Sequence, residues 1–260
     1  MLKGKSGLVT GSTSGIGLSI ARAFAAQGAN VTLNGFGEAA AIEKLRAGIE
    51  QEFGVKAIYS SADMTKPDEI AAMVKTSEQT FGSLDVLMNN AGIQHVAPIE
   101  EFPVDRWETI IALMLTSPFL LARYSWPALK DSGAGRFIAI ASVHGLVASP
   151  FKAAYISSKH GVVGLCKTLA LEGAGHGITA NAVCPAYVRT PLVEKQIADQ
   201  ARAHGLPEEE VIEKVILQPH AVKELIEPSE VAGVVAFLAS PAGKMFTGAP
   251  ITLDQGWTAR

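Results

Sequence analysis

The clearest chemical pattern in this sequence is a tyrosine followed four residues later by a lysine, with a serine a short way upstream. Tyr155 and Lys159 are expected on one face of a helix, because residues four apart are neighbours there. Ser142 directly follows an apolar run over residues 136–141. A phenol titrates near ~10 and a neighbouring ammonium favours the phenolate, so we expect Lys159 to lower the pKa of Tyr155. With Ser142 holding the substrate oxygen, Tyr155 would take a proton from an alcohol.

The Tyr-Lys spacing alone would not justify this prediction, because many exposed helices carry a tyrosine and a lysine four residues apart. The N-terminus provides further support. Residues 6–10 form an apolar-leaning run, three glycines follow within seven residues, and a helical pattern begins. This order predicts a strand, a tight turn and a helix. Glycines let the backbone approach a pyrophosphate, and the helix N-terminus offers free N–H groups and a positive dipole end. We therefore predict a dinucleotide site that includes Gly11, Thr13, Ser14, Gly15, Ile16 and Gly17.

Strand-like apolar runs alternate with helix-length segments along the whole chain. The runs lie near residues 8, 31, 57–59, 86–88, 138–140, 179–183 and 251–253. Such alternation predicts a parallel sheet covered on both faces, that is, an α/β doubly wound Rossmann fold with seven parallel strands. Ligands then bind outside the carboxyl ends of the strands, where the candidate residues fall.

We expect a single domain over residues 1–260, with one insertion at about residues 188–228. That segment is polar, charged and helix-forming, with Pro207 starting a second helix. It is too long for a simple connection, so it is predicted to be a mobile helical substrate lid.

Bulk composition excludes several other classes of protein. A formal charge of −3 and the lack of a basic run give no reason to expect nucleic acid or membrane partners. The first residues lack the apolar segment of a signal peptide, and no uncharged run approaches the ~20 residues of a membrane span. Cys166, Cys184 and the six histidines show no metal-ligand spacing, so no metal is expected and both cysteines are predicted to be buried. We expect a cytoplasmic protein.

Together these features resemble the short-chain dehydrogenase/reductase family over nearly the whole chain. Residues 89–92 read Asn-Asn-Ala-Gly, and residues 184–186 stand where the family has a Pro-Gly turn facing the nicotinamide. The resemblance implies that Asp63 holds the adenine, that Thr190 touches the carboxamide and that Lys159 contacts the ribose. It implies further cofactor contacts, so that beyond the glycine turn the cofactor set is Phe36, Asp63, Asn90, Ala91, Gly92, Tyr155, Lys159, Pro185, Val188 and Thr190.

The end of the second strand bears on the choice of cofactor. NAD enzymes often carry an acid there for the ribose hydroxyls, whereas NADP needs a cation for its phosphate. Residues 34–37 read Asn-Gly-Phe-Gly and offer neither. The absence of a positive group predicts NAD.

Within the family, residues 33–37, 92–95, 141–148, 188–196 and 256–260 resemble bacterial D-3-hydroxybutyrate dehydrogenases most closely. The resemblance implies reversible NAD-dependent oxidation of (R)-3-hydroxybutyrate to acetoacetate by a homotetramer, with Trp257 supplied by a neighbouring subunit. Taken singly, Lys152 and Gln196 would be solvent-facing and Trp257 a packing residue. Together a cation and several neutral donors complement a small carboxylate. The predicted substrate residues are Gln94, Ser142, His144, Lys152, Tyr155, Gln196 and Trp257.

Two alternatives stay open at this stage. One is a reductase of 3-oxoacyl thioesters or a sugar dehydrogenase, although no basic cluster is visible for a carrier-linked substrate. The other is a non-catalytic dinucleotide-binding protein. It arises because Met114 stands where the family usually has an asparagine, whose amide holds a water that connects the active-site lysine to solvent.

Overall fold

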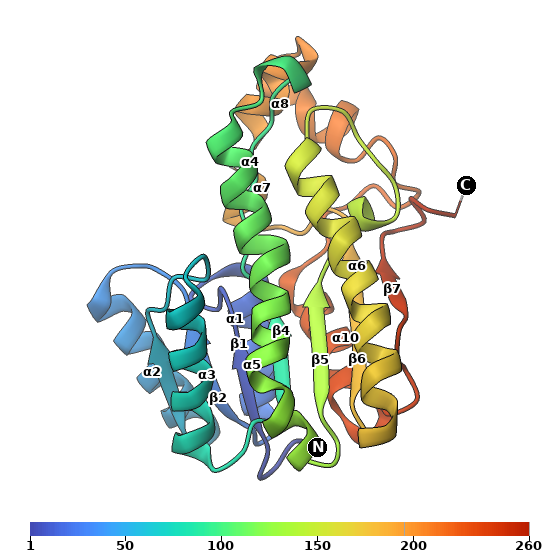
Figure 1. Ribbon diagram of the computed structural model, residues 1–260. Helices are drawn as coiled ribbons and strands as arrows, with labels where there is room; N and C mark the ends of the chain where they lie inside the picture. Colours follow the sequence, from blue (N-terminus) through green and yellow to red (C-terminus); the bar gives the residue numbers. More distant parts are fainter. Residues whose placement is uncertain (195, 260) are drawn as a thin grey trace.

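The computed structural model describes residues 1–194 and 196–259 and has a seven-stranded sheet at its centre (Figure 1). All neighbouring strands pair in parallel. The strand order is β3-β2-β1-β4-β5-β6-β7. Strands β1 to β3 are therefore added toward one side of the sheet, and β4 to β7 are added toward the other side. This is the predicted doubly wound fold, and the prediction is confirmed. The strands are β1 (Ser6–Val9), β2 (Asn30–Asn34), β3 (Ala57–Ser60), β4 (Val86–Asn89), β5 (Arg136–Ile140), β6 (Thr179–Pro185) and β7 (Pro250–Leu253).

Helices cover both faces of the sheet because successive strand residues point to opposite sides. Val9 packs in a cluster with Phe24 and Val235, whereas the preceding Leu8 packs in a second cluster with Leu121. One layer contains α1 (Gly15–Ala26), α2 (Ala39–Phe53) and α10 (Pro228–Ala239). The other contains α3 (Pro67–Phe81), α5 (Ser117–Asp131) and α6 (Ala153–Gly173), of which α5 and α6 lie in front of the sheet in Figure 1.

A long helical rod precedes β5 and contains an unusual turn. Helix α4 (Val104–Ile111) passes into the π-helix η2 (Ala112–Thr116) and then into α5. The wider π turn carries Met114, and such turns are frequent at functional sites. Short 3₁₀ turns complete the structure: η1 (Ile99–Glu101), η3 (Val143–Gly145), η4 (Ala174–His176) and η6 (Pro241–Gly243).

The predicted insertion at 188–228 is helical, as expected. It contains α7 (Pro191–Glu194), α8 (Ile197–His204), α9 (Glu208–Val211) and the π-helix η5 (Ile212–Ile216). These helices form their own apolar cluster, and they lie at one end of the molecule near α4 in Figure 1. The segment begins and ends at one bridge between Val188 and Ile226. Residue 195 of this segment and residue 260 of the C-terminal match lie outside the described residues.

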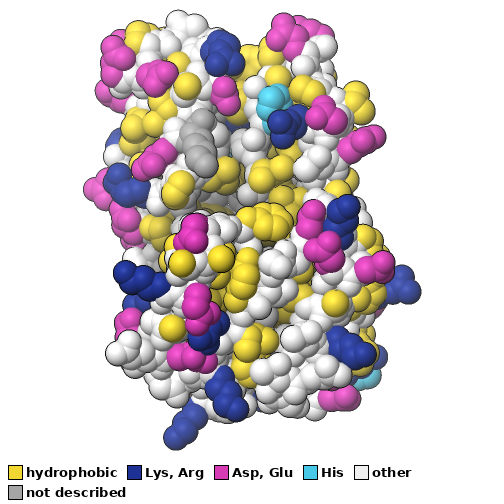
Figure 2. All heavy atoms as spheres, turned by 90° about the vertical axis from the view of Figure 1, so that its left-hand side faces the viewer, with side chains coloured by type: hydrophobic (Ala, Val, Ile, Leu, Met, Phe, Trp, Pro, Cys, Tyr) yellow, Lys and Arg dark blue, Asp and Glu magenta, His cyan; other side chains and the backbone are white. Residues whose placement is uncertain are grey.

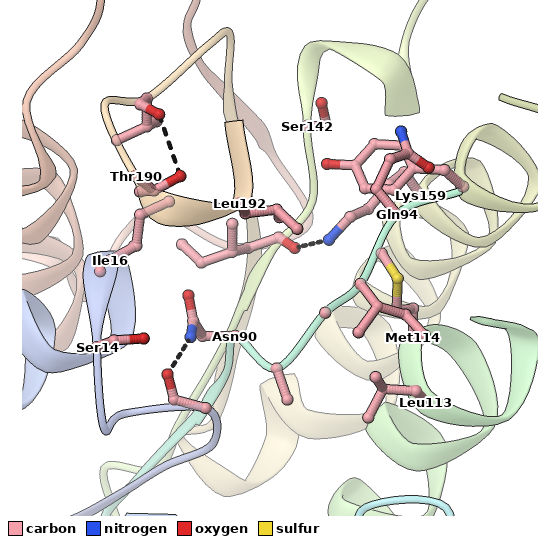
Figure 3. Close-up of a pocket in the computed structure, with 18 of the residues that line it drawn as sticks. Ser14, Ile16, Asn90, Gln94, Leu113, Met114, Ser142, Lys159, Thr190 and Leu192 are labelled. Atoms are coloured by element: carbon pink, nitrogen blue, oxygen red, sulfur yellow. Dashed lines mark hydrogen bonds between the residues drawn. The ribbon is translucent and has the colours of Figure 1, made fainter. Parts of the chain in front are cut away.

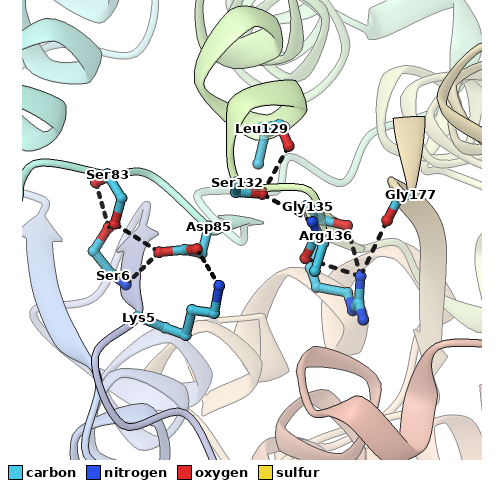
Figure 4. A network of polar contacts seen from close by, with 10 residues as sticks. Lys5, Ser6, Ser83, Asp85, Leu129, Ser132, Gly135, Arg136 and Gly177 are labelled. Carbon is cyan, nitrogen blue, oxygen red and sulfur yellow. Dashed lines mark hydrogen bonds and ion pairs between the residues drawn. The ribbon is translucent and has the colours of Figure 1, made fainter.

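The opposite edge of the sheet, where the strands begin, is joined by polar contacts (Figure 4). The Asp85 carboxylate accepts hydrogen bonds from the backbone N–H of Ser6 at 2.9 Å and from Ser83 Oγ at 2.7 Å, and it pairs with Lys5 Nζ at 2.8 Å. These contacts tie the start of β1 to the start of β4. Among the described helices, none is long and apolar enough to cross a membrane.

Candidate active site

A cavity of about 550 Å³ lies at the carboxyl ends of the strands, between the glycine turn and the helical insertion. Its lining includes every predicted catalytic residue, every predicted cofactor residue except Gly17 and every predicted substrate residue except Trp257. Figure 3 shows Ser14 and Ile16 on one side of it and Met114 and Lys159 on the other. On the face drawn in Figure 2, hydrophobic side chains gather across the middle, with acidic and basic side chains interspersed above and below. The fold thus collects residues from the ends of six strands, β1 to β6, around one hollow.

The three predicted catalytic residues meet in this cavity. Ser142 directly follows β5, and its Oγ accepts a hydrogen bond from the backbone N–H of His144 at 3.1 Å. Tyr155 and Lys159 lie one turn apart on α6, with the Lys159 ammonium 5.4 Å from the centroid of the Tyr155 ring. Lys159 Nζ also donates to the carbonyl oxygen of Ile140 at 2.6 Å. The serine hydroxyl, the phenol and the ammonium therefore share one buried wall.

The electrostatics of this set correct one sequence-based expectation. The pKa of Tyr155 is raised, chiefly because burial disfavours the phenolate, and only the hydrogen bond with Ser142 acts to lower it. Burial likewise lowers the pKa of Lys159 to about 8. The prediction that Lys159 lowers the pKa of Tyr155 is therefore wrong for the free chain. Its ammonium donates to a backbone carbonyl, and burial of the phenol is the largest influence on the pKa of Tyr155.

The turn between β1 and α1 is shaped to receive a phosphate group. Gly11 has φ 62, and a Cβ there would lie 2.8 Å from the Cα of Ala91, so only glycine fits. Asn90 Nδ2 fixes the turn by donating to the carbonyl oxygens of Thr10 and Gly11, both at 3.0 Å. Ser14 makes no side-chain cap, so the first N–H groups of α1 stay available to an anion. A dinucleotide pyrophosphate fits this cradle.

Gly17 has a structural role beside the glycine turn. It does not line the cavity, and a Cβ there would lie 2.3 Å from the carbonyl oxygen of Gly11. The residue lets α1 approach the turn closely, and its contact with the cofactor stays a prediction. Spacing alone could not separate these two uses of a glycine.

The adenosine end of the cavity lies beside the end of β2. Asn34 donates to the carbonyl oxygens of Ser60 at 3.2 Å and Ala62 at 2.9 Å, so its amide is committed to the fold. Phe36 is 69% exposed at the rim and offers a flat apolar surface. Asp63 has a lowered pKa, chiefly because Thr65 donates hydrogen bonds to its carboxylate. The described lining has a carboxylate but no cation at this end.

The substrate end contains a buried cation. Lys152 is only 3% exposed, and its Nζ donates to the Tyr187 hydroxyl at 2.6 Å. No described carboxylate pairs with it, and burial lowers its pKa to about 8. Burial lowers the pKa of His144 to about 3, so this imidazole is neutral, with Nε2 2.7 Å from Ser149 Oγ. An unpaired cation beside neutral polar groups is suited to an anionic ligand.

Two glutamines complete this part of the wall. Gln94 follows β4 and accepts a hydrogen bond from the backbone N–H of His95 at 3.1 Å. Gln196 is 9% exposed, and its Nε2 donates to the carbonyl oxygen of Leu192 at 3.0 Å. The solvent-facing alternatives for Lys152 and Gln196 are therefore wrong.

Comparison with known proteins agrees with this geometry. The family model described as Enoyl-(Acyl carrier protein) reductase matches residues 11–258. The chain belongs to the short-chain dehydrogenase/reductase family. This confirms the family prediction and makes the protein an oxidoreductase of a class that binds a nicotinamide cofactor.

Several named proteins are similar to this dehydrogenase/reductase over their full length. The D-beta-hydroxybutyrate dehydrogenase of Rhizobium meliloti (strain 1021) is 49% identical, covering 98% of this chain and 99% of its own. The protein of the same name from Cupriavidus necator is 48% identical over 100% of both chains. A crystal structure of a dehydrogenase/reductase from Sinorhizobium meliloti 1021 has a TM-score of 0.87 and 34% identity, covering 99% of this chain and 96% of the other.

One residue of this short-chain dehydrogenase/reductase site escaped sequence reasoning. Tyr187 lines the cavity and accepts the hydrogen bond from Lys152, 35 residues away in sequence. Its position two residues after Pro185 was the only signal, and spacing does not reveal a contact of that range. Burial raises the pKa of Tyr187 far above neutrality, so its hydroxyl stays protonated.

Trp257 lies behind the cavity wall in this dehydrogenase/reductase. Its ring stacks on Tyr187 at 6.1 Å and meets His144 edge-on at 5.3 Å, but it does not line the cavity. Within its own chain it is therefore a packing residue. Its contribution from a neighbouring subunit stays a prediction.

Met114 forms part of the cavity floor. It is 3% exposed, packs in a cluster with Ile110 and Ala154, and would lie 3.5 Å from a Cβ placed on Gly92. A thioether accepts hydrogen bonds weakly and donates none. This site therefore lacks a strong polar group where the family usually has an amide.

Proposed function

We propose that this dehydrogenase catalyses the reversible NAD-dependent oxidation of (R)-3-hydroxybutyrate to acetoacetate. The observation that carries the proposal is the buried, unpaired Lys152 in the wall that also holds Ser142 and Tyr155. Burying a cation is costly unless an anion neutralises it, and a substrate carboxylate would do so. Two relatives at 49% and 48% identity are named D-beta-hydroxybutyrate dehydrogenase, which supports the same substrate.

The carboxylate would be held by one charge and several neutral donors. Lys152 supplies a charge-assisted hydrogen bond, and the neutral His144, Gln94 and Gln196 supply further contacts. Tyr187 fixes the Lys152 ammonium at 2.6 Å, which lowers the entropy lost when the substrate binds. Such a site prefers a small hydroxy acid to a neutral alcohol or a sugar.

The residues near the reacting hydroxyl divide the proton chemistry. Ser142 holds the substrate oxygen, and Tyr155 takes the hydroxyl proton as general base. Lys159 lies close enough to stabilise the phenolate form of Tyr155, the form that can accept the hydroxyl proton, and to contact the cofactor ribose. The bound nicotinamide supplies the hydride acceptor. Because burial raises the pKa of Tyr155, this stabilisation is needed to form the phenolate before the proton is transferred.

NAD rather than NADP is proposed as the cofactor. The described lining near the end of β2 offers no cation for a 2′-phosphate, and the Asn34 amide is committed to backbone carbonyls. The Asp63 carboxylate near this end would repel a further negative charge. We also propose one domain over residues 1–260 and a homotetrameric, cytoplasmic enzyme, as the family resemblance implies.

Steady-state assays test the proposal. Purified protein is assayed with (R)- and (S)-3-hydroxybutyrate, each with NAD⁺ and NADP⁺, and cofactor binding is measured separately by titration. We expect turnover with the (R) acid and NAD⁺ and a lower dissociation constant for NAD⁺. Turnover only with a 3-oxoacyl thioester or a sugar would favour the first alternative. Tight NAD⁺ binding with no turnover of any of these would favour the non-catalytic alternative that Met114 suggests.

A further inference from the structure

The buried amide of Asn89 has no hydrogen-bond partner in the described part of the chain. Asn89 ends β4 and is 5% exposed, yet neither Oδ1 nor Nδ2 is bonded. Its neighbour Asn90, by contrast, is bonded to the glycine turn. An unsatisfied buried amide destabilises the fold, and such groups in native proteins usually bind an ordered water.

A small cavity adjoins this amide. It measures about 10 Å³ and lies between the ends of β4 and β5, the π-helix η2 and helix α6, with Asn89, Ser117 and Lys159 on its wall. One water molecule needs about this much space, and it needs two to four polar partners. Met114 also lines the cavity but offers only a weak acceptor.

The Lys159 ammonium needs such a partner as well. It has three donors, of which one is used by the carbonyl oxygen of Ile140. Lys159 is 5% exposed, and it forms no salt bridge with any described residue. Burial lowers its pKa to about 8, so small changes in hydration alter its charge near neutral pH.

We propose that Asn89 holds a water in this cavity and that the water accepts a hydrogen bond from Lys159 Nζ. Asn89 is then a positioning residue for Lys159, and it does the work that an amide at position 114 would otherwise do. The water donates one hydrogen to Asn89 Oδ1 and keeps the ammonium hydrated, which favours the charged lysine. The inference rests on the proposed dehydrogenase activity but not on the identity of the substrate.

The test compares Asn89→Leu with the double variant Asn89→Leu/Met114→Asn. In the single variant we expect kcat to fall about tenfold, with NAD⁺ binding nearly unchanged at pH 6.5, because a contact to Lys159 is lost and not the base itself. The alkaline limb of the kcat profile should move to lower pH, since a less hydrated Lys159 loses its proton earlier. Met114→Asn should restore both in the double variant, because its amide enters the same cavity. A high-resolution crystal structure should show one water between Asn89 and Lys159.

Matched variants separate this role from a structural one. Thr32→Val removes a buried hydroxyl that bonds Ser77 at 2.7 Å away from the site, and it should lower the melting temperature without moving the pH profile. Asn89→Ser keeps a polar group and should lose less than Asn89→Leu, and it replaces Asn89→Leu if that variant does not fold. The assay uses whichever alcohol the wild-type protein oxidises, so a wrong substrate does not affect the result.

Three results would overturn the proposal. The first is an Asn89→Leu protein with unchanged kcat and pH profile, and the second is a loss that Met114→Asn does not restore. The third concerns thermal unfolding. If the cavity is dry, replacing an unsatisfied amide by Leu leaves the melting temperature unchanged or raises it. A held water predicts a lower melting temperature, and this readout is independent of any substrate.

Discussion

Lys152 shows how a single side chain defines the substrate end of the site. The residue type alone predicts an exposed Lys152, because lysine is usually exposed. Only the set of polar residues predicted to bind substrate together with it favoured a place in the site. We expect Lys152→Ala to raise the KM for 3-hydroxybutyrate roughly ten- to hundred-fold, with little change in NAD⁺ binding. The reason is that the variant loses a charged hydrogen bond worth ~1.5–3 kcal/mol. Tyr187→Phe removes only the hydroxyl that orients this ammonium and should raise KM less. An unchanged KM in Lys152→Ala would remove this residue from the site.

The same lysine predicts a pH dependence. Burial lowers the pKa of Lys152 to about 8, so its charge is present below that pH and is lost as pH rises through it. Binding of a simple carboxylate such as acetate to the NAD⁺ complex should therefore weaken above pH 8. Lys152→Arg keeps its charge and should bind acetate equally at pH 7 and pH 9. The measurement is the inhibition constant of acetate across this range, and a flat profile in the wild-type protein contradicts the assignment.

Met114 leads to the prediction that the site can catalyse without the asparagine that the family usually has at this position. The groups that bind or move the proton, on Ser142, Tyr155 and Lys159, are all in place, so we expect the native protein to turn over. Met114→Asn should change kcat by no more than about tenfold, because it alters a contact to Lys159 and not the base. If the native protein binds NAD⁺ without turnover and Met114→Asn switches activity on, the non-catalytic alternative is the better one.

At the scale of elements, apolar runs predicted all seven strands, because the strands of a parallel sheet covered on both faces are typically rich in apolar residues. The π-helix at 112–116 was not predicted, since Ala-Leu-Met-Leu-Thr has the composition of an ordinary helix. The contact between Lys152 and Tyr187 was also missed, because it joins α6 to the segment after β6 and depends on how these elements pack. Local sequence thus predicts the elements better than the contacts between them.

The helical insertion yields a prediction about motion. Its helices pack mainly in their own apolar cluster. The ties to the rest of the chain lie mostly at the two ends of the insertion, in the Val188–Ile226 bridge and in the backbone bonds from residues 221 and 222 to Gln255. We therefore expect the helices between these ends to open, and to close when ligands reach Gln196. Hydrogen exchange over residues 197–216 should slow when NAD⁺ and acetate are added together, while exchange in α10 stays unchanged. Equal protection with and without ligands would rule out a ligand-driven lid.

At the scale of the whole molecule, the two edges of the sheet have different roles: the carboxyl edge forms the ligand site and the amino edge stabilises the fold. The carboxyl edge holds glycines, the unsatisfied amide of Asn89 and the buried cation of Lys152, all of which cost stability but suit ligand binding. The amino edge is closed by hydrogen bonds around Asp85 (Figure 4). The cavity lies at the opposite ends of the strands. Changes at the amino edge should therefore alter stability and leave catalysis unaffected.

Asp85→Ala tests this division. Without the carboxylate, the buried backbone N–H of Ser6 loses its partner, which costs about 1–3 kcal/mol. The ion pair adds little, because the Lys5 side chain is 40% exposed. The matched control is Glu52→Ala, which breaks an exposed pair with Arg22 and should cost less than about 1 kcal/mol. Urea unfolding measures both, and kcat and KM of the folded proteins should match the wild type. A loss for Asp85→Ala no larger than the control's, or a changed kcat with intact folding, would mean that the two edges are not independent.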